Sequence, residues 1–191
     1  MKSLRQKVSL DRKEARKIKK QHKPEIHMLR VLKEWNEWED IPGVFIDFPH
    51  GAAKPNIFNV IITPDNGYWK GGSFLFSFEI GSDYPMSPPS VSCRSGPIYH
   101  PNIDTRGNIC LNLLRPDWTA ASTFGNVIYG LILLFESPNF NDPLPSGDFL
   151  EGMEPFQLYS KNKDEFAATV RMTMAGGKVD KLGDVEFNRV L

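Results

Sequence analysis

Cysteine is scarce in this chain, and several motifs that would assign a function are missing. Only two of its 191 residues are cysteines, Cys93 and Cys110, so a disulfide framework is excluded as the basis of the fold. The four histidines show neither CxxC nor HExxH spacing, and we therefore expect no metal site. No GxxxxGK(S/T) or GxGxxG loop occurs, so we do not expect the chain itself to bind nucleotide.

Long apolar runs are missing as well. None approaches the roughly 18 residues that a membrane-spanning helix requires. The first residues, MKSLRQKVSLDRKEARKIKKQ, lack the apolar stretch of a signal peptide. We therefore expect a soluble intracellular protein without a membrane partner.

Net charge is zero, but the charges are unevenly distributed. Residues 1–23 contain ten Lys or Arg and two Asp or Glu, so this segment carries +8 and the remainder −8. We interpret residues 1–23 as a flexible basic docking arm and residues 24–191 as the folded core domain. A solvated tail without a partner is the alternative. Nucleic-acid binding is disfavoured because the arm has no aromatic residue and the body is acidic.

The order of elements indicates an α+β fold. Apolar spacing predicts a helix that opens at Pro24 and Glu25 and stops at the Ile41-Pro42-Gly43 sequence. Four strands with short connections then predict an antiparallel meander. These strands are expected at residues 44–48, 57–63, 74–80 and 91–94. A long loop, a buried helix and a final long helix follow, at residues 95–121, 126–135 and about 155–175, and a short helix is expected to close the chain.

The long loop contains the one cysteine that we consider a nucleophile candidate. Cys110 lies in a polar stretch near Gly107 and Asn108, where a thiol is more often reactive than in a strand. A cysteine nucleophile usually needs a base, so these residues alone leave its role open. Cys93, by contrast, falls within a strand pattern and is interpreted as a core residue.

Four motifs around this loop resemble those of the ubiquitin-conjugating enzyme family. His100-Pro101-Asn102 precedes Cys110 by the family's spacing of eight residues from the asparagine. The other three are Tyr84-Pro85-Met86-Ser87-Pro88-Pro89 upstream, Trp118 after the cysteine, and Asn141-Asp142-Pro143-Leu144. The resemblance implies a four-stranded meander with an N-terminal helix, an active-site loop and C-terminal helices.

The resemblance also implies a role for each motif residue. Cys110 would accept a ubiquitin-like modifier as a thioester and pass it to a substrate lysine. Asn102 would stabilise the oxyanion or only brace the loop, and Asp142 would position the lysine. His100 and Pro101 would be structural, although a Cys-His pair is the other reading of His100.

Further contacts are implied around the site. Tyr99 is expected to pack beside the site or to contact the incoming lysine, and Asn112 to face the substrate. Met86, Trp118 and Ala120 are expected to lie on a ligase surface. Ala120 departs from the family, which usually has proline there. Residues 146–154 resemble an insertion before the last helix, and the sequence gives no account of its purpose.

Several segments resemble the neddylation-type subgroup, whose modifier is attached to cullins. They include residues 100–118 and the last-helix ending at residues 170–177. The basic arm resembles the subgroup's extension that docks on its activating enzyme and on a ligase co-factor, with Met1 and Leu4 in apolar pockets. The expected docking residues also include Lys13, Lys17, Lys19, Lys20, Arg30 and Lys33.

The implied partners are this activating enzyme, the ubiquitin-like modifier, a RING-type ligase and a cullin. We expect no cofactor, because the activating enzyme consumes the ATP, and we expect a monomer in cytoplasm and nucleus. The alternatives are a conjugating enzyme for ubiquitin itself and a non-catalytic binding module, which would lack Cys110. A cysteine hydrolase would need a His-acid pair that no motif supports.

Overall fold

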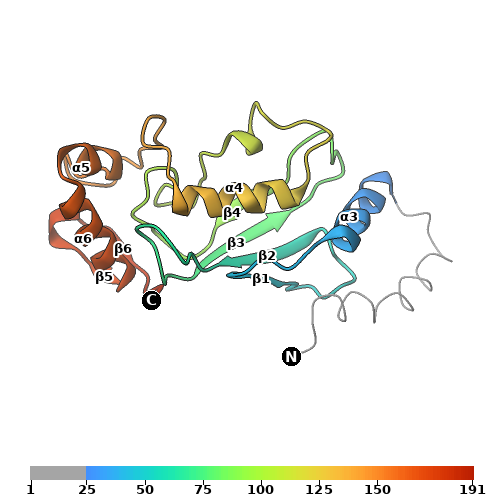
Figure 1. Ribbon diagram of the computed structural model, residues 1–191, viewed down its shortest axis with the longest axis horizontal. Coiled ribbons are helices and arrows are strands. Elements are labelled where there is room, and N and C mark those ends of the chain that lie inside the picture. Colours follow the sequence, from blue (N-terminus) through green and yellow to red (C-terminus); the bar gives the residue numbers. More distant parts are fainter. Residues whose placement is uncertain (1–24) are drawn as a thin grey trace.

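The computed structural model describes residues 25–191, and they confirm the α+β prediction (Figure 1). The elements in chain order are α3 (Ile26–Glu37), β1 (Val44–Asp47), β2 (Ile57–Ile62), β3 (Phe74–Glu79), β4 (Ser90–Cys93), η1 (Asn112–Leu114), α4 (Phe124–Glu136), α5 (Pro155–Lys161), α6 (Lys163–Met174), β5 (Gly177–Lys178), η2 (Asp180–Leu182) and β6 (Glu186–Phe187). The long axis of the molecule runs from α3 at one end to α5 and α6 at the other, with the sheet and α4 between them (Figure 1).

The central sheet is an antiparallel meander in the order β1-β2-β3-β4. All four predicted strands are present, each within one residue of its expected bounds. Alternate β3 residues, including Phe76 and Phe78, are buried because a strand turns every second side chain to the same face. Phe78 stacks on Phe58 of β2 with ring centroids 4.9 Å apart, and these rings form much of the core.

Helix α4 covers the buried face of the sheet. At its end, Phe135 stacks on Phe74 of β3 at 4.4 Å, and at its start Phe124 contacts Phe58 of β2 at 5.3 Å. The helix begins two residues before its predicted start because Thr123 and Asn126 form a reciprocal capping box. This box is the local signal that sets the first turn.

The first described helix is shorter than expected. It begins at Ile26 and ends at Glu37, because Trp38 adopts an extended backbone (φ −63°, ψ 131°) before the Ile41-Pro42-Gly43 sequence is reached. Trp35 is buried among aromatic rings, with Phe124 at 4.5 Å and Phe58 at 4.7 Å. Trp35 is therefore a core residue, and Trp38 lies partly buried beside the same rings.

The predicted final helix is wrong as a single element, because it consists of α5 and α6. Asn162 lies between them in an extended conformation (φ −157°, ψ 102°). Its backbone N–H caps α5 through Leu158, and its side chain accepts a hydrogen bond from the Glu165 N–H at the start of α6. One polar residue thus ends one helix and starts the next.

The chain closes with a 3₁₀ turn, η2, and a small β5–β6 hairpin, where a short helix was expected. No helix within residues 25–191 combines the length and the apolar character that crossing a membrane requires.

Candidate active site around Cys110

The turn before Cys110 is built around a buried carboxylate. Asp104 accepts hydrogen bonds from the Arg106 N–H and from both the backbone and the side chain of Asn108, at 2.7 to 2.9 Å. Gly107 adopts φ +84°, and a Cβ there would meet the Cys93 carbonyl oxygen at 2.3 Å. Only glycine allows this close approach of the loop to β4, so the turn holds the following residues in a fixed position.

Asn102 connects the loop to the segment that carries Asp142. Its carbonyl accepts the Cys110 N–H at 2.8 Å. Its side-chain amide donates to the carbonyls of Asn139 (2.8 Å) and Asp142 (3.2 Å), while its side-chain oxygen accepts the Asn139 N–H at 2.8 Å. The residue is fully buried. In this arrangement the amide braces the loop, which favours the bracing role over the oxyanion role.

His100 is buried against Trp69, with ring centroids 4.2 Å apart. Its Nδ1 accepts the Asn102 N–H at 2.9 Å, so the proton sits on Nε2, which donates to the Leu134 carbonyl at 3.0 Å. Burial lowers the pKa of His100 to about 3. Both ring nitrogens are occupied, which supports a structural role and leaves no lone pair for the Cys110 thiol.

Cys110 itself is partly exposed, and its sulfur has a cationic neighbour. Arg115 directly follows η1, and one of its Nη atoms donates a hydrogen bond to Sγ at 3.8 Å. A guanidinium here can stabilise negative charge on sulfur as a thiolate attacks or leaves. Sequence reasoning missed Arg115, although it is the first basic residue after the cysteine and lies five positions away.

Asp142 lies on an exposed segment tied to the loop. Asn102 holds its carbonyl, and the Leu144 N–H donates to the Pro101 carbonyl at 2.7 Å. Within the part of the chain that the structure describes, its carboxylate has no hydrogen bond or ion pair. It is therefore available to an incoming ammonium group.

Tyr99 does not face a substrate. Its ring is fully buried between Phe149 and Phe166, and its hydroxyl donates to the Met153 carbonyl at 2.7 Å. Burial raises the pKa of Tyr99. The expectation of a lysine contact is therefore corrected: Tyr99 anchors the insertion, residues 146–154, to the core.

The insertion joins the active-site loop to the C-terminal hairpin. Asp148 accepts a hydrogen bond from the Thr105 hydroxyl in the loop. Leu150 donates its N–H to the Leu182 carbonyl of η2, and Phe149 stacks on Phe187 of β6. Bracing of this kind gives the insertion a structural role that its sequence did not indicate.

The predicted ligase residues lie on two adjoining loops. Met86 is highly exposed, and its neighbour Pro85 accepts a 2.8 Å hydrogen bond from the Trp118 indole. Ala120 is exposed two residues further along the same loop, and Asn112 is exposed at the start of η1.

Of the predicted docking residues, only Arg30 and Lys33 lie within the described chain. Lys33 is exposed on α3 and pairs with Glu37 at 3.7 Å. Arg30 is engaged internally with Glu34 and with the Ser122 carbonyl at 3.1 Å, and its role in docking stays a prediction. Met1, Leu4, Lys13, Lys17, Lys19 and Lys20 lie outside the described residues.

Comparisons with known proteins agree on one family. A sequence profile of the family described as ubiquitin-conjugating enzyme matches residues 12–174. The chain is 38% identical over 175 residues to the "Probable NEDD8-conjugating enzyme Ubc12-like" of Arabidopsis thaliana, which covers 91% of this chain and 86% of that protein. It is 37% identical over 182 residues to "NEDD8-conjugating enzyme ubc12" of Schizosaccharomyces pombe, which covers 95% and 96%. The solved structure "S. cerevisiae Ubc12" superposes with a TM-score of 0.76 at 32% identity and covers 98% of this chain and 97% of that one.

Proposed function

Because this chain belongs to the ubiquitin-conjugating enzyme family, we propose that it is a conjugating enzyme for NEDD8 that uses Cys110 as its thioester carrier. Family membership makes it a transferase of the ubiquitin-like conjugating class. The choice of modifier is supported by relatives that carry the name NEDD8-conjugating enzyme. The single observation that carries the role of Cys110 is its partly exposed thiol, held through its backbone N–H by the fully buried Asn102.

Two acyl transfers make up the reaction. The Cys110 thiolate attacks the thioester on the activating enzyme, and the new sulfur–carbonyl bond replaces the old one as the activating enzyme's thiolate leaves. A neutral substrate lysine then attacks this carbonyl, an amide forms, and the Cys110 thiolate leaves. Arg115 stabilises the sulfur as it gains charge, and Asp142 orients the lysine and attracts it as an ammonium group before it loses its proton.

The proposed partners follow from this chemistry. The activating enzyme consumes the ATP, so the chain needs no cofactor of its own. A RING-type ligase engages the surface around Met86, Trp118 and Ala120 and presents a cullin lysine. A ligase co-factor and the activating enzyme bind the basic arm, and the chain works as a monomer in cytoplasm and nucleus.

A charging assay tests the proposal. The purified chain is incubated with ATP and either the NEDD8 activating enzyme with NEDD8 or the ubiquitin activating enzyme with ubiquitin, and is analysed on non-reducing gels. We expect an adduct with NEDD8 that a thiol reductant removes. Cys110→Ala should form no adduct, whereas Cys110→Ser should form an oxyester that resists the reductant.

The other outcomes distinguish an error in the assigned activity from an error in the assigned modifier. An adduct only with ubiquitin keeps the enzyme and overturns the NEDD8 assignment. An adduct with NEDD8 that persists in Cys110→Ala overturns the assignment of the carrier residue. No adduct with either modifier contradicts the proposal as a whole.

A further inference from the structure

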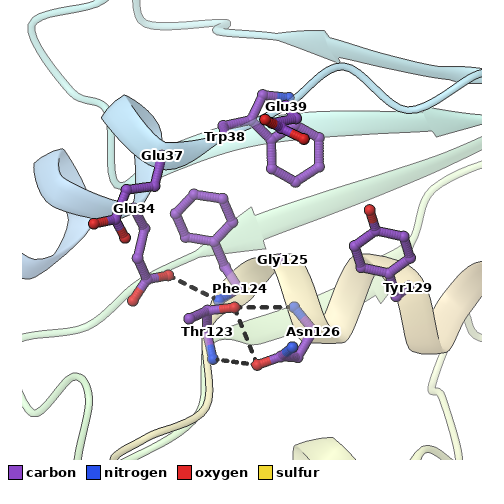
Figure 2. A pocket seen from close by; sticks show the side chains of 9 residues that line it. All are labelled: Glu34, Glu37, Trp38, Glu39, Thr123, Phe124, Gly125, Asn126 and Tyr129. Atoms are coloured by element: carbon purple, nitrogen blue, oxygen red, sulfur yellow. Dashed lines mark hydrogen bonds between the residues drawn. The ribbon is translucent and has the colours of Figure 1, made fainter.

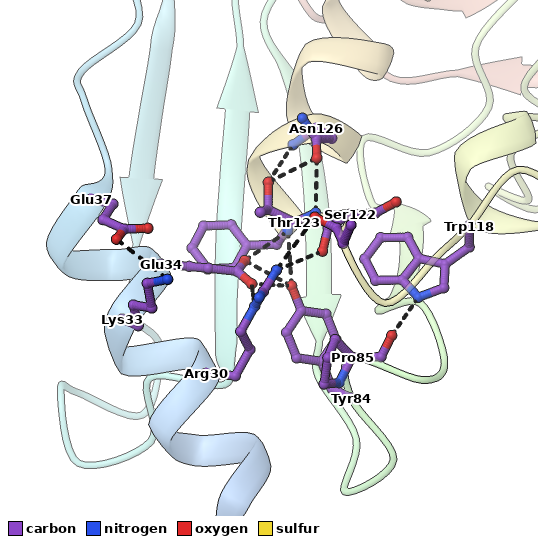
Figure 3. A network of polar contacts seen from close by, with 12 residues as sticks. Arg30, Lys33, Glu34, Glu37, Tyr84, Pro85, Trp118, Ser122, Thr123 and Asn126 are labelled. Atoms are coloured by element: carbon purple, nitrogen blue, oxygen red, sulfur yellow. Dashed lines mark hydrogen bonds and ion pairs between the residues drawn. The ribbon is translucent and has the colours of Figure 1, made fainter.

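A buried carboxylate lies at the end of the molecule where α3 meets the predicted ligase surface. Glu34 is 6% exposed, and its side chain points from α3 toward the start of α4 (Figure 3). Its oxygens accept hydrogen bonds from the Tyr84 hydroxyl at 2.7 Å and from the Phe124 N–H at 3.0 Å. The Arg30 guanidinium completes the set through an ion pair.

These three donors explain why a carboxylate is retained there. A buried charge is costly unless it is paired and hydrogen-bonded. Each donor comes from a different segment: Arg30 from the preceding turn of α3, Tyr84 from the turn after β3, and Phe124 from the first turn of α4. Burial and the bond to Glu34 raise the pKa of Tyr84, so its hydroxyl stays protonated and donates.

The start of α4 is held twice. Thr123 and Asn126 form the capping box, and Glu34 supplies a carboxylate to the next N–H, that of Phe124 (Figure 2). A negative charge at a helix N-terminus interacts favourably with the helix dipole. Glu37 and Trp38 line the open pocket beside this contact, but neither joins the network (Figure 2).

The network reaches the loops on which the predicted ligase residues lie. Arg30 donates to the Ser122 carbonyl at 3.1 Å, which fixes the end of the loop that contains Trp118 and Ala120. Tyr84 precedes Pro85, whose carbonyl accepts the Trp118 indole N–H at 2.8 Å (Figure 3). The two exposed loops are therefore tied to each other and, through Glu34, to α3 and α4.

We propose that Glu34 is a positioning residue for ligase engagement, which sets the spacing of the Tyr84-Pro85 turn and the 118–122 loop without contacting the ligase. Arg30 is its partner in this role through the ion pair and the bond to the Ser122 carbonyl. The inference rests on the proposed function, because it takes the Met86, Trp118 and Ala120 surface as the ligase site. It gives a reason for a buried ion pair that the active-site chemistry does not use.

A matched pair of substitutions tests the role. Glu34→Gln keeps the side-chain shape but removes the charge, and its amide brings a donor toward Arg30, Tyr84 and the Phe124 N–H. Glu37→Gln makes the same change one turn further along α3, on a 63% exposed side chain whose partner among residues 25–191 is Lys33. Both variants are charged with the modifier that the wild-type chain accepts. Discharge is then measured against increasing concentrations of a cullin–RING ligase complex and, separately, against free lysine.

For Glu34→Gln we expect charging and discharge to free lysine within about twofold of wild type. The ligase concentration for half-maximal discharge should rise about tenfold, as expected when one charge-assisted hydrogen bond is lost, with the rate at saturating ligase retained. Glu37→Gln should match wild type. Equal behaviour of the two variants overturns the proposal, as does a parallel loss of charging and of both discharge rates in Glu34→Gln.

A second variant covers the case in which Glu34→Gln does not fold. Tyr84→Phe removes only the hydroxyl and leaves the contacts of Glu34 with Arg30 and Phe124. It removes the donor to Glu34 and one acceptor of the Phe124 N–H, which keeps its bond to Glu34. It should fold and raise the same ligase concentration about threefold, as expected for the net loss of one uncharged donor, and an unchanged value overturns the proposal. Wild-type charging is scored in the same gel, so failure of the proposed function appears there and is distinct from failure of the positioning role.

Discussion

His100 and Asn102, the two polar residues of the His100-Pro101-Asn102 motif, both form hydrogen bonds within the protein that support a bracing role. The histidine donates to α4 and accepts from Asn102, and Asn102 in turn holds the backbone at Cys110 and at Asp142. Both side chains are buried with their hydrogen-bonding groups engaged. The motif therefore sets the position of the nucleophile relative to the acidic segment, and substitutions in it change geometry before they change chemistry.

The His100 ring should make folding sensitive to acid. Its pKa is lowered to about 3 in the folded chain and lies near 6.5 when unfolded, so only the unfolded chain takes up a proton in between. The contribution of the His100 ring to the free energy of unfolding is therefore fully present above pH 6.5. It is lost as the pH falls, by up to about 1.4 kcal/mol per pH unit. Urea unfolding of the wild type and of His100→Gln at pH 7 and pH 5 measures this.

From pH 7 to pH 5 the free energy of unfolding of the wild type should fall by about 2 kcal/mol more than that of His100→Gln, because the variant lacks the histidine that takes up a proton on unfolding. His50→Gln, on an exposed loop, retains His100 and should follow the wild-type slope. Parallel pH profiles for wild type and His100→Gln would contradict the buried neutral ring.

Asn102→Ala should separate the two steps of the reaction. The substitution leaves buried partners at Asn139 and Asp142 unsatisfied, so we expect the free energy of unfolding to fall by about 2–4 kcal/mol. Charging should be spared while discharge to lysine slows, because the acidic segment loses its side-chain ties to Asn102 and keeps only the Leu144–Pro101 backbone bond. Denaturation and single-turnover assays measure both effects, with Asn66→Ala, on the exposed turn after β2, as control. An equal loss in charging and discharge would refute this role.

At the scale of elements, the two-residue apolar period and the turn residues predicted the strands of the sheet well. The helix boundaries that these patterns missed are set by local capping. The aromatic residues of β3 recur at every second position, and this spacing predicts a strand with one buried face. The break between α5 and α6 carries only a local signal, an N-cap residue, Asn162, with Glu165 three positions later, in the polar stretch of residues 160–165. It depends on the backbone of one residue, Asn162, which serves both helices.

Asn162→Ala should therefore weaken the α5–α6 junction. Loss of an N-cap side chain costs about 1 kcal/mol, and the rest of the fold is unchanged. Thermal or urea unfolding checks the value, and Lys161→Ala, an exposed neighbour in the last turn of α5, is the control. If both variants unfold together with the wild type, the cap contributes nothing.

At the scale of the whole molecule, the candidate site combines segments that are far apart in the sequence. The spacing of His100 to Cys110 was visible in the sequence because one loop carries it. The ties from Asn102 to Asn139 and Asp142, from Tyr99 to Met153 and from Glu34 to Phe124 span 37 to 90 positions, and only folding brings them together. Glu34 was missed for this reason, whereas Arg115 lies only five positions from Cys110 and was missed because a basic residue in a loop does not reveal where its side chain points.

The separation of charge between residues 1–23 and the rest of the chain predicts an effect of truncation. Deleting this segment should slow charging about tenfold at low salt by removing a docking contact, and less at high salt, because screening weakens charge attraction. The melting temperature should not change. Charging rates at two salt concentrations, with thermal unfolding, test both statements.

A second variant separates charge from apolar contact. Replacing Lys13, Lys17, Lys19 and Lys20 by glutamine lowers the charge of the segment from +8 to +4 and keeps Met1 and Leu4, so it should weaken the salt dependence and remove only part of the charging rate. An unchanged charging rate after deletion would leave the segment as a tail without a docking role.

The contrast between the two cysteines has a practical result for labelling. Cys93 lies in β4 beneath the Gly107 turn, and burial raises the pKa of its thiol to about 11, whereas Cys110 is partly exposed. Alkylating reagents act on thiolates that they can reach. Toward iodoacetamide or a maleimide dye the folded chain therefore behaves as a single-thiol protein, so the wild type can be titrated, tagged or crosslinked at its carrier position without first removing the other cysteine.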